Sequence, residues 1–217
     1  MSVAVLSCVL GGFDNLRDPD PQSVAFTFHR WTDDNFPLIT GLSPRLQYRI
    51  PKTHGWSMLP GFDVYLWLDG AVTLKRDDCL KWYLDQLGDN DIGFFAHPYR
   101  QTVKQEVEHI EDHIKKGKPY ITERYLNGRH RENYELMIEE GYEDDVLYAS
   151  TLFVYKNTDQ VRKFLADWWY MGSLYYSCDQ VVLPMLLKKH QLKVKTFDEP
   201  IYKTGYMSLF THHKAKK

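Results

Sequence analysis

The sequence contains one stretch that decides the fold, Phe62-Asp63-Val64-Tyr65-Leu66-Trp67-Leu68-Asp69-Gly70-Ala71. Its apolar run has no polar alternation, which is typical of a strand that is covered on both faces within a parallel sheet. The run stops at Asp69 and Gly70, so a carboxylate is expected at the carboxyl edge of the sheet, where open α/β sheets bind ligands. A tight turn is the alternative interpretation, because an Asp-Gly pair is favoured in turns.

Length, charge and cysteine content limit the class of protein. The chain has 217 residues, a formal net charge of -2 and 43% hydrophobic residues, which suits a single α/β domain over residues 1–217. A near-neutral charge argues against nucleic-acid binding through bulk electrostatics. No apolar run reaches the ~20 residues of a membrane span. Three cysteines without metal-type spacing indicate reduced thiols and a cytoplasmic location. The short basic tail could lead into a further domain.

Apolar runs alternate with helical patterns along the chain. Strands are expected at Val3–Leu10, Ser23–Phe28, Val64–Asp69, Val72–Leu74, Asp91–Ala96, Val146–Tyr155 and Lys193–Phe197. Helices are expected after Asp78, after a capping box at Thr102, within Pro119–Gly141, after Asn157, and after Ser177 with a bend or break at Pro184. The segment Trp31–Pro44 is expected to be an irregular loop. This alternation predicts an α/β fold with a mainly parallel sheet.

Two other predicted strands also end in residues that suit a ligand site. The first strand runs into Gly11 and Gly12, where the backbone can approach a ligand closely or simply turn. The strand at 91–96 runs into His97 and Arg100. These two side chains could contact a phosphate or an acceptor, or they could be a packed histidine beside a surface arginine.

Three cations, Arg45, Arg49 and Lys52, precede the central strand. Scattered cations are most often solvated on the surface. At the carboxyl edge of a sheet, however, they could neutralise bound phosphates. Both interpretations remain open at this point.

Four segments, in this order, resemble the GT-A-type, nucleotide-sugar-dependent glycosyltransferases. They are Val5-Leu6-Ser7-Cys8-Val9-Leu10-Gly11-Gly12, Tyr65-Leu66-Trp67-Leu68-Asp69-Gly70, His97-Pro98-Tyr99-Arg100 and Ser177-Cys178-Asp179-Gln180. The resemblance spans nearly the whole chain, and it extends to N-terminal domains of multidomain chlorella virus glycosyltransferases that build capsid-protein glycans. It implies a single GT-A-like domain with a central, mainly parallel mixed sheet flanked by helices.

The resemblance also implies an activity. The chain would transfer a hexosyl or deoxyhexosyl unit from a UDP-sugar, of the UDP-glucose or UDP-rhamnose type, to a glycan acceptor on a glycoprotein. For a viral protein of this kind the host cytoplasm would be the location. A different class of function stays open, in which the chain is a catalytically weak module of the same fold that binds nucleotide-sugars or glycans.

Site residues follow from the resemblance. The donor would be held by Leu10, Gly11, Gly12, Arg49, Lys52, Asp69, Gly70, His97 and Arg100. Asp179 and Gln180 would be catalytic beside the donor sugar, where a carboxylate can stabilise an oxocarbenium-like transition state. Asp179 could instead be an aspartate of the first helical turn that only stabilises the helix dipole.

A divalent ion, Mn²⁺ or Mg²⁺, is implied as the cofactor, because a diphosphate is a hard oxygen anion whose departure such an ion assists. The implied ligands are Asp69 with His212 or His213. The chain departs from the family pattern at Ala71, which stands where the second aspartate of the Asp-X-Asp motif would fall. Without that ligand, metal binding would be weak, or Arg49 and Lys52 would take over the charge.

Overall fold

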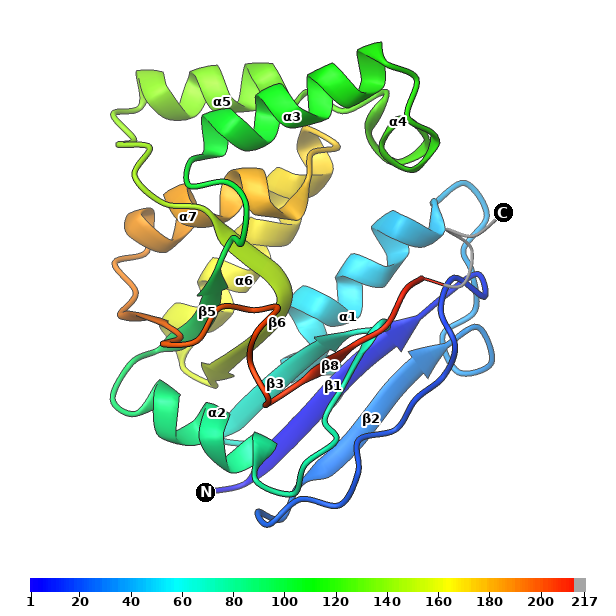
Figure 1. Cartoon of the computed structure of the whole chain (residues 1–217), viewed down its shortest axis with the longest axis vertical. Coiled ribbons are helices and arrows are strands. Elements are labelled where there is room, and N and C mark those ends of the chain that lie inside the picture. Colours follow the sequence, from blue (N-terminus) through cyan, green and yellow to red (C-terminus); the bar gives the residue numbers. More distant parts are fainter. Residues whose placement is uncertain (213–217) are drawn as a thin grey trace.

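The computed structural model describes residues 1–212, which contain a six-stranded sheet in the order β2-β1-β3-β6-β5-β7 (Figure 1). In that order the strands span Thr27–Thr32, Val3–Val9, Val64–Asp69, Tyr148–Lys156, Ile92–Ala96 and Val194–Thr196. Neighbouring strands are parallel except at β6, which runs antiparallel to both β3 and β5. A short antiparallel pair is formed by β4 (Val72–Thr73) and β8 (Ser208–Leu209).

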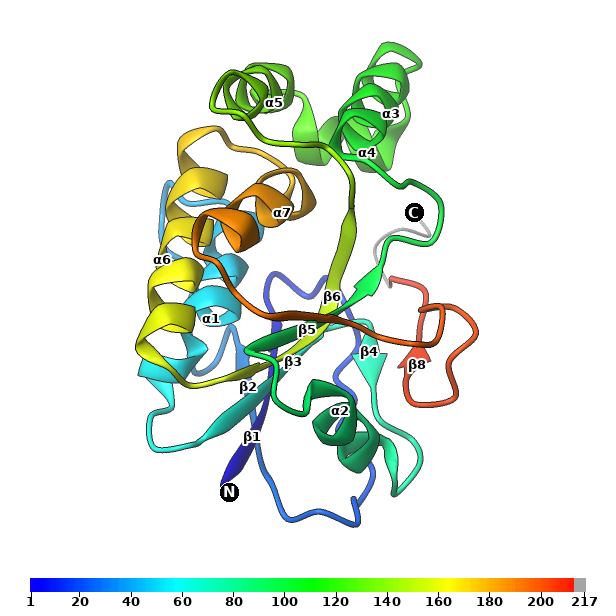
Figure 2. The ribbon, with the colours of Figure 1, turned by 90° about the vertical axis from the view of Figure 1, so that its left-hand side faces the viewer.

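Helices cover the two faces of the sheet unequally (Figure 2). On one face lie α1 (Pro44–Met58), α6 (Asp159–Leu174) and α7 (Asp179–Lys189), and on the other lies α2 (Cys79–Leu87) with β4 and β8. Beyond the end of the sheet lie α3 (Val103–Lys115), α4 (Pro119–Tyr125) and α5 (His130–Glu139). This arrangement confirms the predicted α/β fold with a mixed, mainly parallel sheet flanked by helices.

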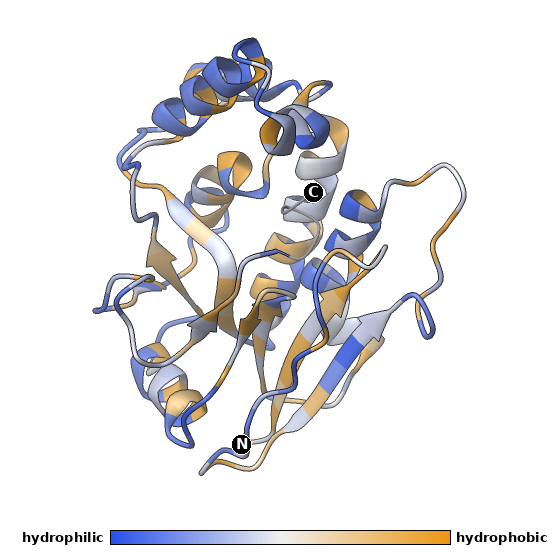
Figure 3. Cartoon of the chain, turned by 45° about the vertical axis from the view of Figure 1, so that its right-hand side comes forward, coloured by the Kyte–Doolittle hydropathy of each residue, from blue (hydrophilic) through white to orange (hydrophobic). Residues whose placement is uncertain are grey.

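The apolar side chains follow this layering. In Figure 3 hydrophobic residues are concentrated along the strands, whereas the helices beyond the end of the sheet carry many hydrophilic ones. Strand β3 buries every residue from Val64 to Leu68, as its unbroken apolar run predicts. It pairs in parallel with β1 so that Asp69 lies opposite Cys8. The loops that follow these two strands therefore start at the same edge of the sheet.

Helix α1 is absent from the sequence-based prediction, which left this region without a regular element. Ser43 caps the helix by accepting a hydrogen bond from the Leu46 backbone N–H, and Pro44 occupies the first turn. Pro51 lies inside the helix, a position that normally discourages helix. Close packing outweighs that preference, since a Cβ on Gly55 would meet Leu6 Cδ1 of β1 at 2.5 Å.

Two smaller predictions are also wrong. Strand β2 begins at Thr27 rather than Ser23 and continues to Thr32, because its position is fixed by parallel pairing with β1 from Ala4 to Val9. Helix α7 runs from Asp179 to Lys189 with Pro184 inside it, so the predicted break is wrong, whereas a bend at Pro184 stays a prediction. Every residue from 181 to 187 of that helix is buried, so tertiary packing holds the backbone helical.

None of the helices formed by the described residues is both long and apolar enough to span a membrane.

Candidate active site

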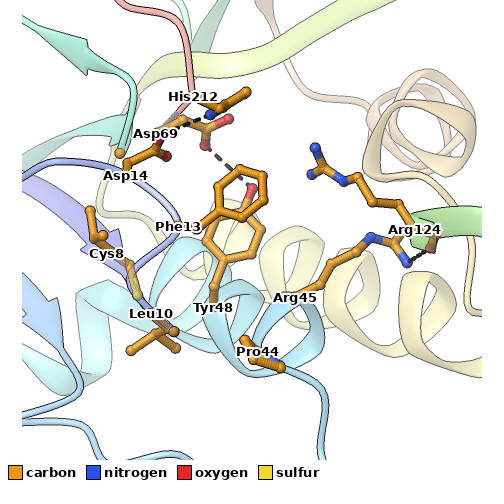
Figure 4. Close-up of a pocket in the computed structure, with 13 residues that line it drawn as sticks. Cys8, Leu10, Phe13, Asp14, Pro44, Arg45, Tyr48, Asp69, Arg124 and His212 are labelled. Atoms are coloured by element: carbon orange, nitrogen blue, oxygen red, sulfur yellow. Dashed lines mark hydrogen bonds and ion pairs between the residues drawn. The ribbon is translucent and has the colours of Figure 1, made fainter. Parts of the chain in front are cut away.

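A cavity of about 210 Å³ opens where β1 and β3 end (Figure 4). It is lined by Cys8, Val9, Leu10, Gly11, Phe13, Asp14, Pro44, Arg45, Tyr48, Asp69, Gly70, Arg124 and His212. Five residues predicted for the site are in this set, namely Leu10, Gly11, Asp69, Gly70 and His212. Seven others, Gly12, Arg49, Lys52, His97, Arg100, Asp179 and Gln180, are not, and His213 lies outside the described residues.

Asp69 is held firmly at the end of β3. Its Oδ1 accepts hydrogen bonds from the indole Nε1 of Trp67 at 2.7 Å, from Lys52 Nζ at 3.2 Å and from the Tyr48 hydroxyl at 3.3 Å. Burial raises the pKa of Asp69, and the Lys52 ammonium and the Trp67 indole oppose that rise only in part. The side chain is 24% exposed. One oxygen is thus saturated with donors while the carboxylate still borders the cavity.

Asp179 begins α7 and lies behind the cavity in a buried cluster of charges. Its Oδ1 pairs with Arg49 Nη2 at 2.5 Å, and its Oδ2 pairs with Lys52 Nζ at 3.1 Å. Lys52 therefore bridges the two carboxylates, Asp69 and Asp179. Burial by itself raises the pKa of Asp179, but Arg49 and Lys52 outweigh it, so the net pKa lies well below the usual range.

We call Arg49 and Lys52 the buried cation pair. They are 4% and 1% exposed, and each has a carboxylate partner. Arg49 also donates to the carbonyls of Gly172 and Ser177, at 3.1 and 2.5 Å. These bonds leave the pair no uncompensated charge to offer a phosphate. The role that fits Arg49 and Lys52 is therefore to hold the carboxylates of Asp69 and Asp179 in position.

Asp14, in the loop after β1, is a cavity residue that the sequence reasoning missed. Its Oδ1 lies 2.8 Å from Nδ1 of His212, and the Phe13 ring packs against the same imidazole with a centroid distance of 4.9 Å. The chain therefore returns from β8 to cover the loop after the first strand. The polar segment that follows β1 is the only sequence signal for Asp14, and it does not single out this residue.

The donor set for a metal ion is incomplete within residues 1–212. Asp69 and His212 line one cavity, yet no group of three His, Cys, Asp or Glu side chains among the described residues is placed to hold a metal. Ala71 is 2% exposed, and its carbonyl accepts from the Phe210 N–H. The residues therefore fit a divalent ion only in part.

Three other predicted site residues, His97, Arg100 and Gln180, are bonded to neighbouring side chains. Arg100 pairs with Glu106 and places Nη2 3.0 Å from His97 Nε2. Burial and the Arg100 charge lower the pKa of His97 to about 4, which makes this imidazole neutral at pH 7. Gln180 accepts a weak bond from the Cys178 thiol at 3.6 Å.

Cys8 lines the cavity but is a poor nucleophile. Burial, reinforced by Asp33 and Asp69, raises the pKa of its thiol far above the ordinary value. A thiolate is the reactive form of cysteine, so covalent catalysis by Cys8 is disfavoured.

No protein-family model matches the chain, and no curated protein sequence does. Among solved structures it is similar to mouse xyloside xylosyltransferase 1 in its apo form, at 9% identity and a TM-score of 0.46, over 91% of this chain and 86% of the other. It is also similar to the galactosyltransferase LgtC in complex with donor and acceptor sugar analogues, at 12% identity and a TM-score of 0.45, over 95% and 86%.

A third similar structure is core-mannan synthase A from Aspergillus fumigatus in a Mn/GDP form. The identity is 10% and the TM-score 0.38, over 91% of this chain and 73% of the other. Likenesses this distant do not show what the chain does.

Proposed function

We propose that the chain is a glycosyltransferase that moves a hexosyl or deoxyhexosyl unit from a UDP-sugar to a glycan acceptor. The observation that carries this proposal is the cavity at the carboxyl ends of the adjacent parallel strands β1 and β3, bordered by Asp69. In open α/β sheets this edge is where ligands bind. The resemblance in the four sequence segments supplies the class of substrate, including a glycoprotein acceptor of the kind found on viral capsids.

The roles of the cavity residues follow from their geometry. Gly11 has a φ of +64°, a backbone conformation that residues other than glycine rarely adopt. Because Gly11 has no side chain, its backbone can line the end of the cavity that we assign to the nucleotide. Asp69 uses Oδ1 for its three internal donors, and its Oδ2 accepts no hydrogen bond from residues 1–212. We assign Oδ2 to the donor, either to a hydroxyl of the sugar or to a bound cation.

Asp179 acts through its neighbours in this proposal. Its carboxylate fixes Lys52, and Lys52 in turn fixes Asp69. Asp179 is therefore a positioning residue, and Gln180 remains a predicted contact beside it.

The test compares two aspartates at opposite ends of one strand. Asp69→Asn keeps the size of the side chain but removes its charge. We expect the rate of UDP release in the presence of a glycan acceptor to fall by about 100-fold or more, because charges aimed at the reacting centre contribute on that scale. The matched control is Asp63→Asn. Asp63 lies on the surface at the start of the strand, where its carboxylate accepts hydrogen bonds from Ser2. A normal rate for Asp69→Asn would contradict the proposed site.

A binding module is the second candidate function. It is favoured by one observation, the buried Ala71 where the family carries a second carboxylate. Calorimetry with UDP-sugars, run beside acceptor-dependent UDP release, separates the two. Binding of UDP-sugars without release of UDP on any glycan acceptor would establish the module and overturn the enzyme.

A further inference from the structure

We propose that Arg45 and Arg124 form the diphosphate-binding pair of the cavity, supplying the positive charge that the buried cation pair cannot. This inference rests on the proposed function, because it takes a nucleoside diphosphate as the ligand. We call the two residues the cavity cation pair. The sequence offered Arg45 only as one of three cations that could neutralise phosphates, and Arg124 comes from a segment that the sequence marks only as charged and helical.

Both guanidinium groups are held at the cavity by local contacts. Arg45 Nη1 donates to the carbonyl of Arg124 at 2.7 Å, and Nη2 donates to the carbonyl of Ser177 at 2.9 Å. The Arg45 guanidinium also lies 4.3 Å from the centroid of the Tyr125 ring. The side chain of Arg45 thus joins the first turn of α1 to the backbone of α4.

Arg124 reaches across the mouth of the cavity. Its guanidinium lies 4.8 Å from the centroid of Tyr120 and 5.8 Å from that of Phe13. Figure 4 shows it extending from α4 toward Phe13 and Tyr48, on the same side of the cavity as Arg45. Aromatic faces attract a cation but carry no net charge. The contacts therefore orient Arg124 without neutralising it.

The two cation pairs differ in their counter-ions. Neither Arg45 nor Arg124 makes an ion pair with a carboxylate of residues 1–212, whereas Arg49 and Lys52 both do. The nearby carboxylates have other partners: Asp69 and Asp179 pair with Lys52, Asp14 lies beside His212, and Asp33 accepts from the Gly11 N–H. A half-buried cation without a counter-ion is costly, and a bound anion would remove that cost.

The chemistry of the two side chains points to phosphate. Guanidinium groups present planar, forked donors that match phosphate oxygens in a bidentate fashion. The same cavity offers backbone at the end of β1 and the Asp69 carboxylate, which suit the nucleoside and sugar ends of the same ligand. A nucleoside diphosphate thus provides an anionic partner for both guanidinium groups and fills the rest of the site. An isolated phosphate would satisfy only the charge.

The experiment measures binding of UDP, uridine and pyrophosphate to the full chain by calorimetry, in EDTA and with Mn²⁺. In EDTA, Arg124→Gln and Arg45→Gln should each weaken UDP binding by about 10-fold or more, the scale of a charge-assisted hydrogen bond. Uridine affinity should not change. Arg124→Lys, which keeps the charge but not the fork, should fall between wild type and Arg124→Gln.

The matched control is Arg129→Gln. This arginine lies five residues further along the chain, outside the cavity lining, and pairs with Glu132. It should bind UDP like the wild type. Melting temperatures of all variants are recorded, and Arg124→Lys keeps the test valid if a glutamine variant fails to fold.

Three outcomes would overturn the inference. Wild-type UDP affinity in both glutamine variants would exclude the cavity cation pair as the phosphate site, and acceptor-dependent transfer in the same preparation would leave the proposed function standing. UDP binding that disappears in EDTA, with no effect of either arginine, would assign the diphosphate to a metal ion. Pyrophosphate that binds as tightly as UDP with the same arginine dependence would show a general anion site rather than a nucleotide site.

Discussion

The two cation pairs of this molecule share one helix, α1, which carries both members of the buried cation pair and one member of the cavity cation pair, yet their roles are opposite. Arg45, Arg49 and Lys52 are spaced so that they share one side of α1. Arg49 and Lys52 lie under the cavity and are matched by Asp179 and Asp69. Arg45 lies in the first turn, at the cavity, and is joined there by Arg124 from α4. Among residues 1–212 the two have carbonyls, aromatic rings and the Tyr120 hydroxyl as partners, and no carboxylate.

A cation's partners, rather than its proximity to a site, therefore determine what it can do there. A buried ion pair holds its geometry because the loss of one partner would leave an uncompensated charge in the protein interior, which solvates charges poorly. A half-exposed arginine beside rings and carbonyls keeps its charge available to a ligand. The buried cation pair should therefore affect stability, and the cavity cation pair should affect ligand binding.

The largest effect is expected on stability. Lys52→Met removes the ammonium that bridges Asp69 and Asp179, and should lower the free energy of unfolding by about 3–5 kcal/mol, the cost of breaking a buried ion pair. Urea denaturation measures this loss in the free energy of unfolding. The control is Lys81→Met, which breaks an exposed pair with Asp85 and should have a far smaller effect. A loss for Lys52→Met no larger than for the control would show that the bridge is not structural.

A second effect is expected in acid. Because the pKa of Asp179 is lowered by Arg49 and Lys52 in the folded state, its stabilisation is fully present above the unfolded value of about 3.9 and is lost as the pH falls through the lower folded value. Asp69, whose pKa is raised, acts with the opposite sign.

The measurement is urea unfolding of wild type and Asp179→Asn from neutral pH downward. The difference in unfolding free energy between them should be constant near neutrality and should shrink below about pH 4. A difference that stays constant into the acid range would mean that Asp179 is not ion-paired in solution.

The smallest effect is expected from salt. Raising the ionic strength severalfold above ~0.1 M should weaken UDP binding by a few-fold, because the cavity cation pair is only half-buried and the Debye length in water is only about 10 Å at ~0.1 M. The buried cation pair is screened much less, so the urea midpoint should change little by comparison. UDP affinity that is insensitive to salt would argue against a phosphate contact by Arg45 and Arg124.

The fold was largely predictable, and the site only partly. The unbroken run from Val64 to Leu68 predicts the buried strand correctly, and the capping residues Thr102 and Gln105 mark the start of α3. Helix α1 was missed because Pro51 argues against it locally, whereas its packing on β1 stabilises it from a distance. Local signals therefore failed at the one helix that carries three of the four cations.

By itself the sequence determined that a carboxylate ends a buried strand, and that Leu10 and Gly11 end another, because burial and strand breaks are encoded in neighbouring residues. Only the tertiary structure decided that Asp14 meets His212, 198 positions away, and that Arg124 reaches the same cavity. It also determined that Lys52 forms an ion pair with Asp179. Such pairings depend on how distant segments pack. No local pattern shows which of several cations on one helix face will pair with a carboxylate and which will remain available to a ligand.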